Sequence, residues 1–168
     1  MKRHNSRILS VMILFNMDMN QVDFSSLTEE ERNEITNDVV NVIQDDEYKV
    51  EIDYELTNTM VEYIVSHYDE IKTVISDSLT NWTIDRLSYV DRAILFSATS
   101  EMKLNIAPKQ VIINEYLDIT PCEFFNFNSE NPRETDILYS ELYSMVIDEK
   151  QVKFNNRVLD VIASKVYE

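Results

Sequence analysis

The stretch that decides the fold is Asn81–Met102, which reads NWTIDRLSYVDRAILFSATSEM. Ser88 precedes Asp91 by three residues, the spacing of a capping box, in which the serine accepts from the Asp91 backbone N–H and the Asp91 carboxylate reaches back. Small and apolar residues then recur at helical spacing, which favours close approach of a neighbouring helix. We therefore predict two helices joined at a capped corner, with Trp82 as the largest anchor available to it.

The same stretch resembles the W-x-x-x-R-L-x-x-V-D-R-A-I-L signature of the NusB transcription antitermination factors. Two further blocks follow in the family's order, P-x-x-V-x-I-N-E from Pro108 and F-x-N-x-V-L-D-x-x-A from Phe154. The resemblance implies an all-α, NusB-like bundle of about seven helices in two packed sub-bundles, forming one domain over residues 1–168. It also implies a cytoplasmic, non-catalytic factor that binds boxA-type single-stranded RNA together with the ribosomal protein NusE. Such a factor joins the RNA polymerase antitermination complex and supports transcription of ribosomal RNA operons.

The composition excludes several classes of site. The 168 residues contain no glycine, and glycine-rich phosphate loops, dinucleotide-binding turns and EF-hand loops all require it. One cysteine and two histidines are too few for an ordinary structural zinc site, and we expect no metal or cofactor. The net charge of −16 opposes long-range attraction of nucleic acid, although it leaves room for a local basic patch.

The N-terminal half predicts three helices. The apolar run Ile8–Phe15 follows a basic start, and its spacing favours an amphipathic helix over a signal peptide, because the run is short and no cleavage site follows. Thr28 caps a second helix whose first turn is acidic. After an acidic connector at Gln44–Asp53, one long helix is expected over Tyr54–Ser78, with His67 as a core residue on its apolar stripe. No run is long enough to span a bilayer.

The C-terminal half is longer than the resemblance to the family predicts. Pro108 suits the first turn of a helix that Pro121 ends. Residues 121–153 form an insertion relative to the family, with an irregular first part and an extra helix expected in the second. Apolar residues at helical spacing predict the buried stripe of the last helix: Phe154, Val158, Ile162 and Val166.

Three places carry the predicted RNA site, each with a structural alternative. The basic N-terminus could contact phosphates or be an ordinary terminus. The aromatic residue of the first helix could stack on a base or pack in the core. By resemblance, the central acid could accept from base amino groups, although capping also explains it. With two residues at the start of the last helix, the predicted set is Lys2, Arg3, Arg7, Phe15, Asp91, Lys153 and Asn156.

The acidic charge, the few arginines of the first segment and the 121–153 insertion favour an alternative function. Phe96 stands where many relatives have arginine, and Arg157 stands where they usually have glycine and could restore positive charge. The alternative is a NusB-fold protein-interaction module that has lost RNA binding, whose acidic second helix or insertion contacts a basic protein. An enzyme is the least favoured reading, because Cys122, His4 and His67 carry no local catalytic spacing.

Overall fold

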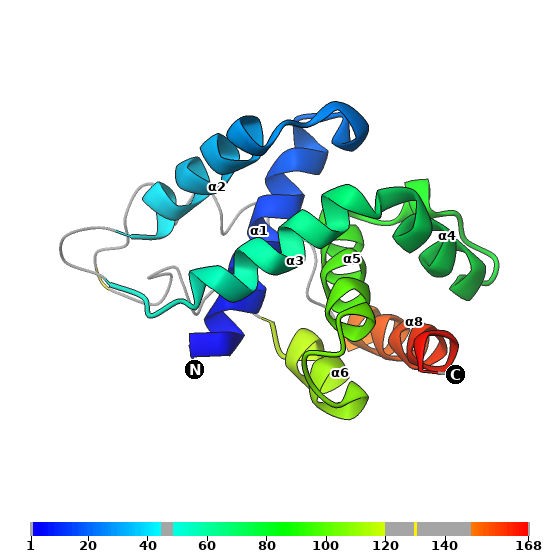
Figure 1. Ribbon diagram of the computed structural model, residues 1–168. Coiled ribbons are helices and arrows are strands. Elements are labelled where there is room, and N and C mark those ends of the chain that lie inside the picture. Colours follow the sequence, from blue (N-terminus) through cyan, green and yellow to red (C-terminus); the bar gives the residue numbers. More distant parts are fainter. Residues whose placement is uncertain (1, 45–48, 120–129, 131–148, 168) are drawn as a thin grey trace.

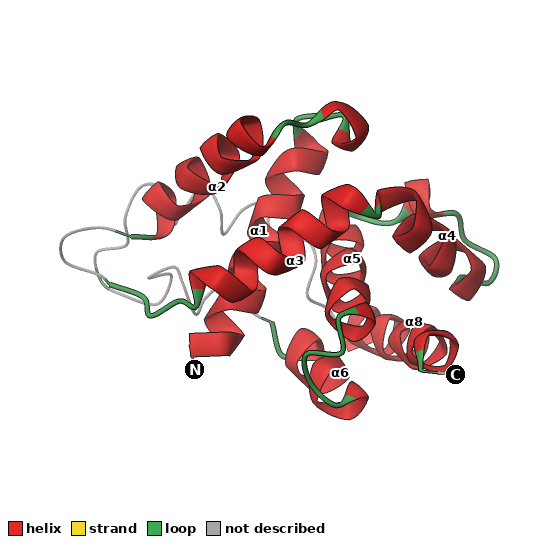
Figure 2. Cartoon of the chain, in the orientation of Figure 1, coloured by secondary structure: helices red, strands yellow, loops and turns green. Residues whose placement is uncertain are grey.

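The computed structural model describes residues 2–44, 49–119, 130 and 149–167, and within these ranges the chain forms helices and loops without a strand (Figure 2). Two 3-10 helices, η1 (Phe24–Ser26) and η2 (Ile84–Arg86), precede α2 and α5. The prediction of an all-α chain is confirmed for these residues. The α-helices are α1 (Lys2–Met19), α2 (Glu29–Ile43), α3 (Tyr54–Ser66), α4 (Tyr68–Ser78), α5 (Tyr89–Lys103), α6 (Lys109–Leu117) and α8 (Glu149–Val166).

Helix α1 lies at the centre of the first group of helices and contacts α2, α3 and α5 (Figure 1). Every residue from Ser6 to Phe15 is buried, so the predicted amphipathic helix is covered on all sides over these turns. Ser6 Oγ donates to the Lys2 carbonyl and Ser10 Oγ donates to the Arg7 carbonyl, which satisfies the polar groups of this segment. A helix that is buried all round forms the core itself.

Helix α5 joins the two groups of helices. It packs against α1 and α3 of the first group and against α4, α6 and α8 of the second. Small residues on α5 allow α1 to approach closely, and Ser97 Oγ shares a short hydrogen bond with Ser10 Oγ of α1. The buried apolar side chains form one continuous cluster across both groups. The central stretch therefore holds the fold together from the inside.

Two predicted helix starts are confirmed. Thr28 Oγ1 accepts from the Glu31 N–H at 3.1 Å, and Glu31 Oε2 accepts from the Thr28 N–H at 2.9 Å, which completes a capping box at α2. At α5, Ser88 Oγ accepts from the Asp91 N–H at 3.1 Å. The Asp91 carboxylate also accepts from the Ser88 hydroxyl at 2.7 Å. The corner is thus closed by a serine and an aspartate that bind each other.

The single helix predicted over Tyr54–Ser78 is wrong, because the chain bends at His67. This residue leaves helical geometry with φ −124° and ψ 29°, and its ring stacks on Tyr63 with the centroids 4.1 Å apart. A straight helix of this length would extend for about 37 Å. The bend instead lets α3 pack against α1 while α4 packs against α5 and α8. His67 is exposed, so its predicted place in the core is also wrong.

The last helix begins at Glu149, four residues before the predicted end of the insertion. Val158 and Ile162 are buried as predicted, while Phe154 and Val166 are half-buried. The predicted irregular segment and extra helix, including Pro121 and Cys122, lie outside the described residues. Among the helices that are described, none is both long and apolar enough to cross a membrane.

Candidate nucleic-acid interface

The corner before α5 combines buried aliphatic residues with exposed residues. Ile84 and Leu87 are buried beneath it, whereas Trp82 is 51 % exposed and Arg86 is exposed. Asn81, with φ 64°, makes the turn that leads into this segment. The prediction that Trp82 anchors the corner is therefore wrong. The aliphatic residues of η2 supply the anchor and leave the indole available at the surface.

Trp82 lies beside an aromatic ring from the last helix. Its ring centroid is 6.5 Å from that of Phe154, with an interplanar angle of 67°, an edge-to-face arrangement. A surface hollow of about 400 Å³ opens beside this pair, between the η2–α5 corner and the start of α8. Its lining combines aromatic, cationic and amide groups: Trp82, Arg86, Leu87, Ser88, Asp91, Lys150, Gln151 and Phe154.

The carboxylate of Asp91 fastens this corner to α8. It is 3 % exposed, and its Oδ2 accepts from Gln151 Nε2 at 2.6 Å while its Oδ1 accepts from Asn155 Nδ2 at 3.1 Å. Together with the Ser88 hydroxyl, these donors satisfy both carboxylate oxygens. Asp91 therefore lines the hollow as a fixed structural group, with little surface left for a ligand.

The sequence reading did not identify Gln151 and Asn155. Both follow the register of the buried residues Val158 and Ile162, since the spacing i, i+4, i+7, i+11 keeps one helix face. A buried Asp91 needs hydrogen-bond donors, and this helix face offers two amides. These two facts together would have identified Gln151 and Asn155. The residues predicted instead, Lys153 and Asn156, are exposed on α8 and do not line the hollow.

The cations of the hollow are not neutralised by the described part of the chain. Arg86 and Lys150 are exposed, and neither forms an ion pair with any described residue. Among the described residues that line the hollow, Asp91 alone carries a carboxylate, and it is engaged by amides. A small surface of a strongly acidic protein thus combines positive charge with an exposed indole and a half-buried phenyl ring.

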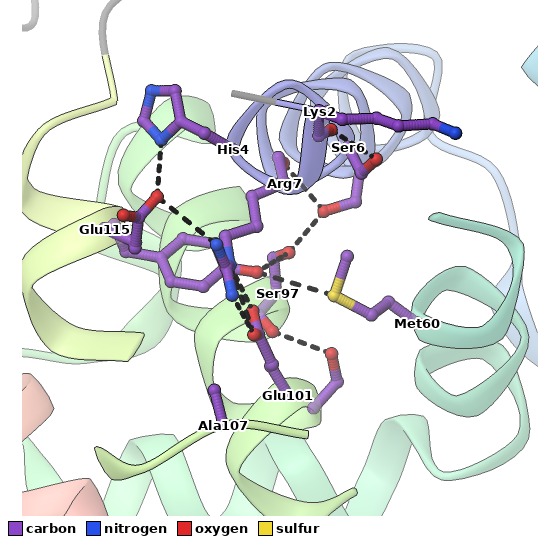
Figure 3. Close-up of polar contacts among 12 residues, drawn as sticks. Lys2, His4, Ser6, Arg7, Met60, Ser97, Glu101, Ala107 and Glu115 are labelled. Carbon is purple, nitrogen blue, oxygen red and sulfur yellow. Dashed lines mark hydrogen bonds and ion pairs between the residues drawn. The ribbon is translucent and has the colours of Figure 1, made fainter. Parts of the chain in front are cut away.

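Arg7 occupies a different environment from the predicted phosphate contact. It is 4 % exposed; its Nη2 donates to Glu101 Oε1 at 2.6 Å and its Nη1 to Glu115 Oε2 at 3.2 Å (Figure 3). Glu101 itself is fully buried. Burial alone would lower the pKa of Arg7, but the hydrogen bonds and charge of Glu101 raise it above its ordinary value. This arginine neutralises carboxylates inside the fold.

A buried tyrosine and a histidine extend the contacts around Arg7. Burial raises the pKa of Tyr116 well above its ordinary value, and Tyr116 Oη lies 2.9 Å from Ser97 Oγ. His4 Nδ1 lies 2.7 Å from Glu115 Oε2, which ties the first turn of α1 to α6 (Figure 3). The start of α1 is thus fixed by polar contacts to α5 and α6.

The predicted site residues lie at two ends of the α1–α5 pair. Arg7 of α1 meets Glu101 near the end of α5, whereas the ring of Phe15 lies edge-to-face with Tyr89 at the start of α5. Because an α-helix rises about 1.5 Å per residue, Arg3 lies about 18 Å from Phe15 along the axis of α1. Lys2 and Arg3 are exposed at the first end, and Phe15, only 6 % exposed, packs in the core at the second.

The described residues do not assemble a metal or nucleophile site. No three histidine, cysteine, aspartate or glutamate side chains among them are grouped to hold a metal ion. His4 lies on α1 against α6, and His67 lies at the bend between α3 and α4, so the histidines belong to different regions. Cys122, their hypothetical partner, lies outside the described residues.

Comparison with known proteins identifies similar sequences and folds. A sequence model described as the NusB family matches residues 4–123. The chain is 30 % identical over 120 residues to the transcription antitermination protein NusB of Staphylococcus aureus strain MRSA252, covering 71 % of this chain and 84 % of the relative.

Solved structures extend the likeness over nearly the whole chain. T. maritima NusB aligns with a TM-score of 0.66 at 22 % identity, covering 98 % of this chain and 92 % of that one. A structure of the antitermination factors NusB and NusE in complex with double-stranded RNA aligns with a TM-score of 0.63 at 21 % identity, covering 96 % of each chain. The shared fold and the family match lead to one conclusion: the chain belongs to the NusB family.

Proposed function

We propose that this chain is a cytoplasmic, non-catalytic antitermination factor that binds boxA-type single-stranded RNA together with the ribosomal protein NusE. In this role it helps RNA polymerase to read through terminators in ribosomal RNA operons. The observation that carries the proposal is the hollow beside Trp82 and Phe154, where an exposed indole and a half-buried ring adjoin Arg86 and Lys150, which pair with no described residue. The curated relatives, described as transcription antitermination proteins, support the cellular process.

The physical argument for RNA rests on stacking combined with local charge. Unpaired bases stack on exposed aromatic side chains, and each such contact contributes about 1–3 kcal/mol to binding. Arg86 and Lys150 supply charge for the neighbouring phosphates over a short range. Because the net charge is −16, the rest of the protein opposes the approach of RNA. We therefore expect selective binding of modest affinity, with a salt dependence set by the few phosphate contacts that these cations make.

Two groups of predicted RNA contacts remain in the proposed interface. Lys153 and Asn156 are exposed on α8 close to Phe154 in sequence, and Lys2 and Arg3 are exposed at the far end of α1. An RNA that contacts both groups must extend along the length of α1. Arg7 and Phe15 are not included, since their side chains are buried, and Asp91 acts through its bonds to α8.

The experiment is a fluorescence anisotropy titration of a short boxA-like RNA, with and without NusE, at two salt concentrations. Trp82→Ala should weaken RNA binding roughly 5- to 150-fold through lost stacking, whereas Trp82→Phe should retain most of the affinity. Tyr54→Ala, which removes another exposed ring (41 % exposed) on α3, serves as the matched control. Equal affinity of wild type and Trp82→Ala would refute the proposed interface.

The N-terminal arm needs substitution rather than deletion. Removing residues 1–7 would also remove the Ser6 bonds to Asp53 and the Arg7–Glu101 pair, and would confound binding with folding. Lys2→Ala combined with Arg3→Ala changes exposed charge only. We expect the slope of log affinity against log salt to fall by about 0.7 for each lost phosphate contact. An unchanged salt slope would mean that Lys2 and Arg3 do not contact the RNA.

The acidic helix α2 supports the second candidate, a protein-interaction module without RNA binding. A hollow of about 370 Å³ between η1 and α2 combines the apolar residues Val22, Leu27 and Ile35 with carboxylates, including Glu34. Such a surface suits a basic, partly apolar segment of a protein partner. Under this function NusE binds without RNA, and Glu34→Lys weakens that binding while Trp82→Ala does not. The opposite pattern favours the RNA-binding function.

A further inference from the structure

A second hollow lies on the other side of the Trp82–Phe154 pair. It has a volume of about 380 Å³, and both aromatic residues belong to its lining as well as to that of the first hollow. On α8, Lys150 and Gln151 of the first hollow precede Phe154, whereas Arg157 and Val161 of the second follow it. The two hollows are therefore successive along α8, with the aromatic pair as the ridge between them.

Arg157 is the charged group of this second hollow. It is exposed, and among the residues that the structure describes it forms neither an ion pair nor a side-chain hydrogen bond. By contrast, Arg92 pairs with Asp18 at 3.0 Å and Lys103 pairs with Glu70 at 2.8 Å. The guanidinium of Arg157 thus retains its five N–H donors for a ligand.

The remaining lining supplies the other groups that a nucleotide requires. Thr80 and Asn81, from the turn after α4, offer hydroxyl and amide groups for the edge of a base. Val161, 41 % exposed, gives an apolar wall. A guanidinium binds phosphate through paired N–H donors, and an indole face stacks on any base. An acidic peptide would use the guanidinium but would leave the ridge of aromatic rings without a role.

We propose that this hollow is a second nucleotide subsite, in which one base stacks against Trp82 and its phosphate is held by Arg157. A single strand then crosses the Trp82–Phe154 ridge with one nucleotide on each side. This inference rests on the proposed RNA-binding function, and it assigns to Arg157 a contact that adds affinity and lengthens the site.

The test measures affinity and its salt dependence for wild type, Arg157→Gln and Arg157→Lys with one single-stranded RNA. Arg157→Gln should weaken binding about tenfold, from the loss of a hydrogen-bonded charge, and reduce the salt slope by about 0.7. Arg157→Lys should keep the slope and lose part of the affinity, because lysine retains the charge without the fork. Lys165→Gln, an exposed cation near the end of the same helix, is the matched control and should change neither value.

Trp82 is the only tryptophan in the chain, so its fluorescence reports occupancy of the ridge directly. RNA should quench this fluorescence in wild type, and Arg157→Gln should shift the quenching to higher RNA concentration. If wild type binds RNA but Arg157→Gln binds with the same affinity and slope, the subsite is refuted while the proposed function stands. If wild type binds no RNA, both fail. If a polyglutamate peptide binds as tightly as RNA and depends equally on Arg157, the hollow is an acidic-peptide site and the nucleotide assignment is overturned.

Discussion

The two ends of the α1–α5 pair use their basic residues in opposite ways. At one end Arg7 is 4 % exposed and faces the carboxylates of Glu101 and Glu115. At the other, Arg86 and Lys150 are exposed beside Trp82 without a described ion-pair partner. A basic residue therefore indicates a nucleic-acid contact only when the fold does not supply its counter-charge. The informative cations are those that lack a described internal partner and also lie beside an exposed aromatic ring.

Arg7→Ala tests the buried end and should have the largest effect on stability. The substitution leaves the fully buried Glu101 without its cation, and breaking such a pair costs about 3–5 kcal/mol. Urea unfolding at pH 7, followed by circular dichroism, measures this loss. Arg3→Ala removes an exposed arginine from the same helix and should change stability by at most about 0.5 kcal/mol.

A double substitution separates charge from packing at the same place. Arg7→Met with Glu101→Leu removes both partners, and such apolar replacements of a buried pair are often neutral or stabilising. We expect the double variant to be more stable than Arg7→Ala. If Arg7→Ala instead folds normally and lowers the salt slope of RNA binding, the phosphate contact predicted from sequence is correct and the structural role assigned to Arg7 is wrong.

Asp91→Ala tests the other end and should have an intermediate effect. It removes the acceptor of Asn155, which is 6 % exposed, and of Gln151, so buried amide donors lose their partner. An unsatisfied buried group costs about 1–3 kcal/mol. Ser88→Ala is the comparison variant, because it removes the helix cap, worth about 1 kcal/mol, and leaves the bonds to α8. No loss of stability in Asp91→Ala would mean that the bonds to α8 contribute nothing.

The features that could be predicted from sequence are those encoded locally. The caps at Thr28 and Ser88 depend on residues three positions apart, and both are confirmed. The helical conformation of α1 follows from the spacing of its apolar residues, whereas its burial on all sides does not. The bend at His67 was missed because periodicity continues through it. Its cause is tertiary, since both helices contact α5, but α3 also packs against α1 whereas α4 packs against α8.

The candidate site was predicted only in part, because its residues come from distant segments. Arg7 and Glu101 are 94 residues apart in sequence, so no local pattern predicts that they pair. Phe96 stacks on Tyr68 at 5.1 Å, and Tyr68 in turn stacks on Phe24 at 4.6 Å, so this residue serves packing. Arg157 is exposed instead, and this difference between the two positions is visible only in the folded chain.

The smallest expected effect comes from Lys103→Ala, which breaks an ion pair near the buried end. Lys103 Nζ lies 2.8 Å from Glu70 Oε1, but the two side chains are 25 % and 50 % exposed. Exposed pairs contribute about 0.2–1 kcal/mol, so a loss of roughly 0.5 kcal/mol is expected in urea unfolding. Lys109→Ala, an exposed lysine without a described partner, is the control and should be neutral.

The loss of stability in Lys103→Ala should depend on pH. The hydrogen bond and charge of Lys103 lower the pKa of Glu70 below its ordinary value. A depressed carboxyl pKa stabilises the folded state above the unfolded pKa, and this contribution disappears as the pH falls through the folded pKa. The difference between Lys103→Ala and wild type should therefore be present at pH 7 and vanish in acid. Suppose that Lys103→Ala and Arg7→Ala lowered the free energy of unfolding equally at pH 7. Burial would then not explain why one cation is structural and another is not, and the contrast between the two ends would lose its physical basis.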